Sequence, residues 1–403
     1  MSSSSYAKQI RSPEVELLLC ATSVRAPEHS SKADHSLLSR IDWDTLLSAA
    51  NNHAVLPQLY QFINSNCAEG IPPDALSRLH DESVRNTRSN LALTAQLVKI
   101  LELFEANGIN AIPYKGPALG VCAYGDISLR QFVDLDLIVR KNDVLKAKDL
   151  LVNGGWQPEF ELSEAQEEVF LDHYYDYAFL RDGKLIEVHW KLTEGYFNFP
   201  IDVERLWSRL EPVAIAGRRI LTLAAEDSLL ILCAHSSKHL WSRLGWVCDV
   251  ANLIKGRNDL NWDEVFQRAD ELGSRRMLSI GLLLSIDLLG AVVPDNVLTE
   301  IRSDTVSMDL AREFAARLFE DRETRPRIIE TARLHMRMRE RPRDRIVYAV
   351  RLSLGTTVGD WTALKIPRSL FFLYYLLRPV RLLGKSVRGF VHRSFSRLTE
   401  PGN

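Results

Sequence analysis

Hydrophobic residues recur at helical spacing through most of the first hundred positions. This periodicity predicts three helical segments, over residues 15–21, 41–62 and 75–105. Asp42 and Asp44 are candidate cap residues for the second segment, and Pro57 is expected to break or kink it. The third segment is polar on one side and ends at Asn107-Gly108, a typical helix stop.

The pattern changes after residue 110. Short apolar runs at 111–114 and 132–139 predict strands, and the second run alternates apolar and acidic residues with period two. Helices are expected at 117–124 and from a cap at Asn142 to residue 153. Residues 174–181 and 184–190 are joined by Asp182-Gly183, which predicts a β-hairpin. Residues 95–215 therefore form a small α/β unit.

Helical periodicity returns beyond residue 225. It predicts helices over residues 225–240, 247–254, 262–272, 274–289 and 308–340, with a break at Arg341-Pro342-Arg343. The predicted fold class is α+β, with a small mixed sheet between helical regions. The expected divisions are an N-terminal helical region (1–92), an α/β domain (93–215), a helical domain (216–340) and a basic helical tail (341–403).

The composition excludes several classes of protein. The chain has 403 residues, 46% hydrophobic and 25% charged, which is typical of folded domains and not of disordered or collagen-like chains. Fifty Lys and Arg face 52 Asp and Glu, so no global basic field attracts nucleic acid. Binding to RNA or DNA would have to be local and is not favoured.

Cysteine usage and apolar run length suggest a cytoplasmic location. The five cysteines contain no CxxC pair and are expected to be reduced core thiols. The N-terminus lacks the apolar core of a signal peptide. The longest apolar stretches, residues 278–293 and 370–377, are shorter than the ~20 residues that span a bilayer.

Candidate chemistry begins with Asp134-Leu135-Asp136. Residues i and i+2 of a strand point the same way, so the two carboxylates share one face, while Val133, Leu135 and Leu137 are expected to point into the core. Adjacent carboxylates repel each other unless a cation lies between them, and Mg²⁺ suits such a pair. A lone Asp-x-Asp is, however, more often a pair of solvated surface acids.

The second hairpin strand supplies a third acid. Glu187 and His189 share one face of that strand, while Ile186, Val188 and Trp190 share the other. If this strand neighbours residues 132–139, Glu187 points toward the two aspartates. The three carboxylates then predict a two-metal centre for phosphoryl or nucleotidyl transfer.

A turn from strand to helix precedes these acids. In Tyr114-Lys115-Gly116-Pro117, the glycine lets backbone approach a phosphate, and the following helix N-terminus favours an anion. Lys115 adds a positive charge. Alone this signal is weak, because Gly-Pro turns are common, but here Arg130 and the acidic strand follow.

Together these motifs resemble the nucleotidyltransferase superfamily that includes DNA polymerase β, and more closely an uncharacterised bacterial nucleotidyltransferase family. The resemblance rests on motifs across residues 40–260, namely Ile41-Asp42-Trp43, Lys115-Gly116, Ala118-Leu119, Tyr124-Gly125, Leu129-Arg130, residues 134–139, Glu187-Val188-His189-Trp190, His235, Lys238-His239, Trp241, Leu244 and Asp249.

The resemblance implies a metal-dependent transfer of a nucleoside monophosphate from an NTP to a hydroxyl of an unknown acceptor, which is a small molecule, a protein or an RNA. It assigns Mg²⁺ or Mn²⁺ to Asp134, Asp136 and Glu187, with Glu187 also a candidate general base. It assigns the nucleotide to Lys115, Gly116, Arg130 and His189. Pro117 replaces the usual serine of the superfamily. The competing interpretations are a phosphotransferase that uses the same acids and a catalytically degenerate NTP-binding scaffold.

A His-Lys-His segment lies on the predicted helix at 225–240. His235 and His239 are four residues apart and share a face. The glutamate of an HExxH zinc motif is missing, since Ser236 takes its position. We expect His235, Lys238 and His239 to contact the nucleotide, with Asp249 orienting a histidine or Lys238. A packed helix with satisfied histidines is about equally consistent, and Trp241 and Trp246 are expected to be packing residues.

The C-terminal tail is basic. Residues 367–383 join aromatic and aliphatic side chains to spaced arginines, and residues 376–403 carry a net charge of +5. Such a segment predicts peripheral contact with an anionic inner membrane surface. Packing of its apolar side on the helical domain, with the arginines in water, is somewhat favoured over membrane contact, and the arginines could also help to bind an RNA acceptor.

Overall fold

The computed structural model describes residues 12–25, 35–66, 70–320 and 328–354. The chain divides into two compact units. The first comprises Met1–Glu159, Asp176–Leu192 and Phe199–Glu340, and the second comprises Phe160–Tyr175, Thr193–Asn198 and Arg341–Asn403.

The first unit begins with helices α2 (Pro13–Thr22), α3 (His35–Leu38), α4 (Trp43–Asn52), α5 (Leu56–Asn66) and α6 (Pro73–Ala106). The helix predicted over residues 41–62 is two helices. Asp42 caps α4 by accepting hydrogen bonds from the backbone N–H groups of Asp44 and Thr45. Pro57 is the second residue of α5, where a missing N–H costs nothing, so the break lies before it.

A five-stranded mixed sheet follows, in the order β1-β2-β5-β4-β3. Its strands are β1 (Ala111–Pro113), β2 (Asp134–Val139), β3 (Gln157–Pro158), β4 (Asp176–Arg181) and β5 (Lys184–His189). β2 pairs with β5 in parallel, and the other neighbours are antiparallel. The predicted hairpin of β4 and β5 is confirmed.

The apolar residues of the two central strands form the core of this sheet. Leu135, Leu137, Ile186 and Val188 are all buried. The expectation that Val133 also points into the core was wrong, because its side chain is 69% exposed. Strand pairing begins only at Asp134, opposite Leu185, so Val133 belongs to the preceding loop.

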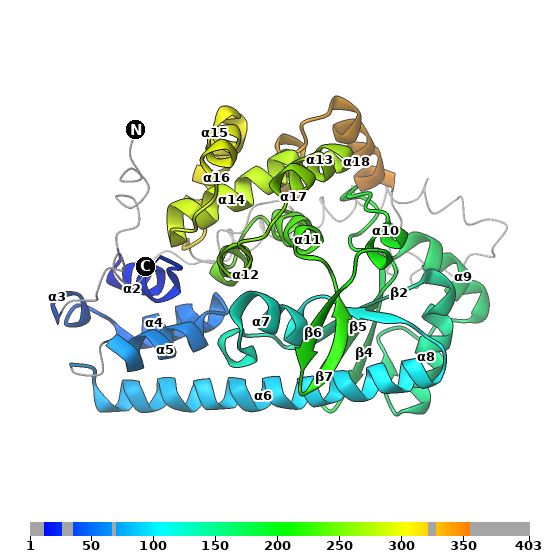
Figure 1. The fold of residues 1–403 in the computed structure, drawn as a ribbon, viewed down its shortest axis with the longest axis horizontal. Helices are drawn as coiled ribbons and strands as arrows, with labels where there is room; N and C mark the ends of the chain where they lie inside the picture. The colour runs from blue at the N-terminus through cyan, green and yellow to red at the C-terminus, as the bar shows by residue number, and fades with distance from the viewer. Residues whose placement is uncertain (1–11, 26–34, 67–69, 321–327, 355–403) are drawn as a thin grey trace, which may run out of the picture. The chain divides into compact units, whose positions relative to one another are not determined.

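The segments that connect β1, β2 and β3 along the chain are α7 (Gly116–Tyr124), the 3-10 turn η2 (Ile127–Leu129), and the 3-10 turn η3 (Lys141–Asp143), which leads into α8 (Val144–Asn153). The predicted cap at Asn142 was wrong, because this residue lies inside η3. The long helix α6 packs against β1, β2, α7 and α8 (Figure 1).

Asn90 of α6 fixes the turn that leads into β2. Its fully buried side-chain Nδ2 donates to the carbonyl oxygens of Ile127 at 2.6 Å and Arg130 at 2.7 Å. Asn86, one turn earlier, donates to the carbonyl of Ser128 at 3.2 Å. These bonds satisfy the backbone of an irregular segment and thereby set the position of Arg130.

The rest of the first unit is a hairpin and a set of helices. After α10 (Val203–Trp207), β6 (Glu211–Ile215) and β7 (Arg218–Thr222) form a two-stranded sheet. Helices α11 (Ala225–Lys238), α12 (Leu244–Gly256), α13 (Trp262–Leu272), α14 (Arg275–Leu289), α15 (Asp295–Ser303), α16 (Thr305–Arg317) and α17 (Ile328–Arg337) follow. α12 packs against both α14 and α7 (Figure 1). The helix predicted at 308–340 is therefore not continuous.

The second unit holds α9 (Glu164–His173) and α18 (Pro342–Leu354). Arg351 of α18 donates to the Gly195 carbonyl at 3.0 Å and to the Asn198 side chain at 2.9 Å. The basic segment at residues 367–383 lies outside the described residues. Across the part of the chain that the structure describes, no helix is both long and apolar enough to cross a membrane.

No disulfide joins two cysteines within the described ranges. Cys233 and Cys248 are buried, as expected of core thiols, whereas Cys20 and Cys122 are only partly covered. Cys67 lies outside the described residues.

Candidate functional site

The pairing of β2 with β5 brings the predicted acids together. Asp136 lies directly opposite Glu187 in the parallel ladder, and Asp134 lies opposite Leu185, two positions earlier. Because paired residues project from the same face, the Asp136 and Glu187 side chains are neighbours. The condition for a shared site, that the hairpin strand lies beside the acidic strand, is therefore met.

Three polar groups converge on Oδ1 of Asp136. Lys115 Nζ lies at 3.1 Å, His189 Nε2 at 3.3 Å and the Tyr114 hydroxyl at 3.5 Å. The Asp136 side chain is only 2% exposed. Burial alone would raise the pKa of this carboxyl, but Lys115 and His189 outweigh it and hold the pKa well below its usual range. Asp136 is thus a buried anion with cationic partners.

His189 bridges the two acids. Its Nε2 is also 3.2 Å from Oε2 of Glu187, and the Tyr114 ring meets the imidazole edge-on at 5.5 Å between centroids. Burial opposes the charged ring, yet the interactions with Asp136 and Glu187 raise the pKa of His189 to about 9. His189 was predicted to contact the nucleotide, and the structure brings it to the carboxylates.

Asp134 has a less favourable environment. Burial, followed by the charge of Asp136, raises its pKa to about 6. Among the described residues, the group whose ligand atoms all lie within 4.8 Å of one another consists of Asp136, Glu187 and His189. These three could hold a metal ion, and Asp134 stands outside the trio.

Gly116 begins α7 directly beside the acidic strand. Its φ is +49°, a left-handed value that disfavours residues with a side chain. A Cβ at this position would lie 3.3 Å from the backbone oxygen of Asp134. Glycine therefore allows the N-terminus of α7 to approach the start of β2, with Lys115 immediately before it and Pro117 after it.

Arg130 is held by a buried acid. Its Nε and Nη2 donate to Oδ1 and Oδ2 of Asp249, at 2.9 and 3.0 Å, and the Tyr124 hydroxyl donates to Oδ1 at 2.8 Å. The expectation that Asp249 orients a histidine or Lys238 was therefore wrong. The contact depends on packing of α12 against α7, which no local pattern indicates. Tyr124 was not predicted as part of this network.

The predicted histidine pair forms a cluster with Trp246. The ring centroids of His235 and His239 are 4.7 Å apart, and they lie 5.6 and 5.2 Å from Trp246. Burial, and then the charges of Lys115 and of His239, lower the pKa of His235 well below its usual value. The backbone oxygen of Lys238 lies 3.0 Å from His335 Nε2, at hydrogen-bond distance. Trp241 is fully buried, as expected of a packing residue.

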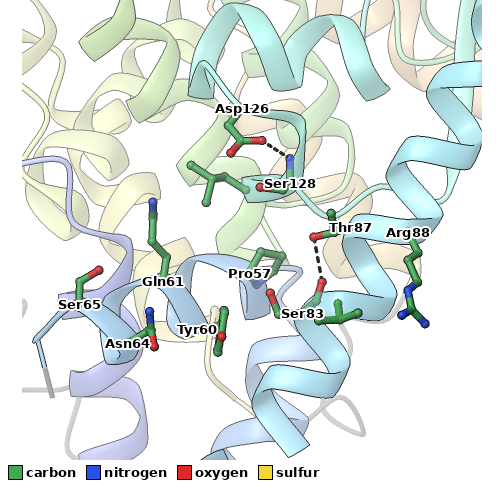
Figure 2. A pocket seen from close by; sticks show the side chains of 12 residues that line it. Pro57, Tyr60, Gln61, Asn64, Ser65, Ser83, Thr87, Arg88, Asp126 and Ser128 are labelled. Atoms are coloured by element: carbon green, nitrogen blue, oxygen red, sulfur yellow. Dashed lines mark hydrogen bonds between the residues drawn. The ribbon is translucent and has the colours of Figure 1, made fainter. Parts of the chain in front are cut away.

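A separate pocket of about 490 Å³ lies between α5, α6 and η2 (Figure 2). Tyr60, Gln61 and Asn64 of α5 face Asp126 and Ser128 across it. None of the predicted site residues lines this pocket. Its lining includes Ser128 and Leu129 of η2, the turn that immediately precedes Arg130.

The raised pKa of Asp134 leads to a stability prediction for Asp134→Asn. An acid whose folded pKa is above its unfolded value destabilises the fold once it ionises, so stability falls as the pH rises from about 4 to about 6. The neutral asparagine removes this cost. Without divalent ions, we expect its free energy of unfolding at pH 7.5 to exceed that of wild type by about 1–3 kcal/mol, with no gain at pH 4.

Denaturant titration at the two pH values measures this difference. Asp149→Asn is the matched control, because the Asp149 side chain is 69% exposed. An equal stability of Asp134→Asn and wild type at pH 7.5 would show that Asp134 is not strained by its neighbours.

Comparison with known proteins identifies the family of this chain. A family model described as an uncharacterised nucleotidyltransferase matches residues 39–290. The solution structure of the antibiotic-resistance factor ANT(2'')-Ia is similar with 14% identity and a TM-score of 0.34, covering 46% of this chain and 94% of that one. A search of curated proteins found no match. Since the family model covers more than half of the chain, this protein belongs to the uncharacterised nucleotidyltransferase family and is a transferase.

Proposed function

We propose that the protein transfers a nucleoside monophosphate from an NTP to a hydroxyl-bearing acceptor, with Mg²⁺ or Mn²⁺ as cofactor. One observation carries the proposal: Asp136 and Glu187 stand side by side on parallel strands, with the ammonium group of Lys115 at 3.1 Å from Asp136. A pair of acids beside a cation at a strand–helix turn suits a triphosphate and its counter-ions.

The donor set fits a divalent ion. Asp136 and Glu187 supply carboxylate oxygens, the preferred ligands of Mg²⁺ and Mn²⁺, and Asp134 supplies a further one on the same strand face. Burial and, after it, the charge of Asp136 raise the pKa of Asp134, and a bound cation would offset that repulsion. When bound, the ion would polarise the phosphate oxygens and stabilise the charge that develops on them.

The chain's own residues have the remaining roles. Glu187, whose side chain is 26% exposed, is the candidate base that takes the proton of the acceptor hydroxyl. The hydroxyl oxygen then forms a bond to the α-phosphorus, and the bond from that phosphorus to the β-phosphate oxygen breaks. The products are the nucleotidylated acceptor and pyrophosphate.

Phosphate binding falls to the turn before α7. Gly116 lets the helix N-terminus approach the acids, and Lys115 extends to Asp136, where it can also reach a bound phosphate. His235, Lys238 and His239 remain nucleotide-binding candidates, and burial, followed by nearby positive charges that include Lys115, lowers the pKa of both histidines. Arg130 supplies positive potential while it stays paired with Asp249.

A catalytically degenerate NTP-binding protein is the second candidate. Pro117 occupies the second position of α7, where it offers neither a hydroxyl nor an N–H to a phosphate. Lys115 and His189 already neutralise Asp136 and Glu187 in part. These features favour binding without turnover if the nucleotide cannot displace them.

An assay with NTP that carries a radioactive label on either the α-phosphate or the γ-phosphate distinguishes nucleotidyl transfer, phosphoryl transfer and binding without turnover. Full-length protein is incubated with Mg²⁺ or Mn²⁺, each NTP in turn, and a cell extract as the source of acceptors. Label moving from the α-phosphate to a new product, with release of pyrophosphate, is the expected result. Label moving from the γ-phosphate instead indicates a phosphotransferase, and binding without turnover indicates the degenerate protein. Failure of every NTP to bind would contradict the proposal.

A further inference from the structure

We infer that His189 is a direct metal ligand, which binds through Nε2 and completes a mixed nitrogen and oxygen site with Asp136 and Glu187. This site prefers Mn²⁺ to Mg²⁺. The inference rests on the proposed function only in placing a divalent ion at these acids, and it assigns a new role to a residue between them.

The distances around Nε2 suit a shared ion. Nε2 lies 3.3 Å from Oδ1 of Asp136 and 3.2 Å from Oε2 of Glu187. Two ligand atoms that bind one ion at a right angle, each about 2.1 Å from it, are about 3.0 Å apart. The three groups therefore need only small shifts to surround an ion, and the side chains of Asp136 and His189 are 2% and 3% exposed.

A fourth residue, Asp176, lies beside His189 on the neighbouring strand. Asp176 of β4 is the direct cross-strand partner of His189 in the antiparallel β4·β5 pair, so their side chains share a face. The charge of Asp176 acts on the imidazole. Metal-binding histidines commonly give their second ring N–H to a carboxylate, which fixes the ring and leaves the other nitrogen for the metal. Asp176 is the candidate positioning residue.

The nitrogen decides the preference between the two ions. Mg²⁺ selects oxygen ligands and keeps several waters, whereas imidazole is a ligand of first-row transition ions. Mn²⁺ belongs to that series and accepts carboxylates as readily as Mg²⁺ does. A site with one imidazole and two carboxylates therefore raises the affinity for Mn²⁺ relative to Mg²⁺.

The alternative is that His189 acts only as an internal counter-ion for the two acids. In that case the ring moves aside when an ion binds, and no nitrogen contacts the metal. Both arrangements are consistent with the distances from Nε2 to the two carboxylates in the metal-free protein. They differ once Mn²⁺ binds, because only a ligand His189 places a nitrogen atom in direct contact with the ion.

Electron spin-echo envelope modulation of bound Mn²⁺ tests this directly. Full-length protein is freed of metal by chelation and loaded with less than one equivalent of Mn²⁺. We expect modulation from a directly bound ¹⁴N nucleus, which changes to the ¹⁵N pattern when the protein is labelled with ¹⁵N-histidine. This readout needs no mutation, so it holds even if a variant fails to fold. A spectrum without nitrogen coupling would overturn the inference.

Variants identify which histidine is responsible. His189→Gln should abolish the nitrogen signal, whereas His80→Gln, at an exposed histidine of α6, should leave it unchanged. Loss of supporting contacts around a metal ligand typically weakens binding 10- to 100-fold, so loss of the ligand itself should weaken Mn²⁺ binding at least about tenfold. Mg²⁺ binding, measured by competition with Mn²⁺, should change much less. An equal loss for both ions would contradict the proposed selectivity.

The outcome of the Mn²⁺ spectroscopy can be interpreted whether or not the protein is catalytically active. Nitrogen coupling in a protein that turns over no NTP would support the ligand and count against the proposed function. Nucleotidyl transfer by a protein without nitrogen coupling would support the function and remove His189 from the metal site.

Discussion

Replacement of Asp136 by asparagine is expected to abolish nucleotidyl transfer. Asparagine keeps the size of the side chain and one oxygen, but it removes the negative charge at the point where Lys115, His189 and Tyr114 converge. A bound ion contributes several kcal/mol of transition-state stabilisation, so its loss corresponds to a decrease in rate of about 10³-fold or more. The measurement is the release of pyrophosphate under conditions where wild type is active.

The fold of the Asp136→Asn variant is expected to survive with a distinctive pH dependence. In wild type, the raised pKa of His189 stabilises the fold fully below pH 6.5, and this contribution is lost as the pH rises toward about 9. The variant lacks the carboxylate that holds the proton on His189. Asp136 has a lowered pKa, so its own contribution is lost in acid, and the stability difference between the two proteins should be largest between about pH 4 and pH 6.5 and should shrink toward pH 9.

Activity is therefore best compared near pH 8.5, with circular dichroism as the check on folding. Asp149→Asn, at an exposed acid, is the control and should keep wild-type turnover. Normal turnover by a folded Asp136→Asn variant would remove Asp136 from the catalytic site.

The acidic strand and its partner could be predicted because their signals are local. Alternation of apolar and acidic residues puts Asp134 and Asp136 on one face, and the Asp182-Gly183 turn fixes the register of the hairpin that carries Glu187. The adjacency of β2 and β5 was a condition on which the predicted three-acid site depended, and was not itself predicted. Local signals alone do not predict this pairing, since β2 and β5 are separated along the chain by two α-helices and two further strands.

Contacts between distant elements escaped prediction. Arg130 and Asp249 are 119 positions apart, and their pairing depends on how α12 packs against α7. The place of His189 could be predicted only in part. Alternation put it on the same face as Glu187, but its distance from Asp136 follows from the parallel register of β2 and β5. Likewise, Val133 continues the apolar pattern of β2 but stands one residue outside the hydrogen-bonded ladder.

The Arg130–Asp249 pair leads to the largest expected effect on stability. The two side chains are 12% and 4% exposed, and Asp249 accepts two hydrogen bonds from the guanidinium and one from Tyr124. Asp249→Asn leaves the arginine charge buried without a counter-ion. Breaking a buried pair from one side typically costs about 3–5 kcal/mol of unfolding free energy, and we expect a loss of this size.

A double substitution separates the cost of an unpaired charge from the value of the pair itself. Combining Arg130→Met with Asp249→Leu removes both charges, so the double variant should be more stable than Asp249→Asn alone. Glu204→Gln is the matched control, because it breaks the exposed pair with Arg140, whose side chains are 38% and 64% exposed, and should cost at most about 1 kcal/mol. Denaturant titration of the three variants at pH 7 measures these differences. If Asp249→Asn were no less stable than Glu204→Gln, the buried pair would not be what joins α12 to the turn before β2, and Arg130 would be available to bind a phosphate directly.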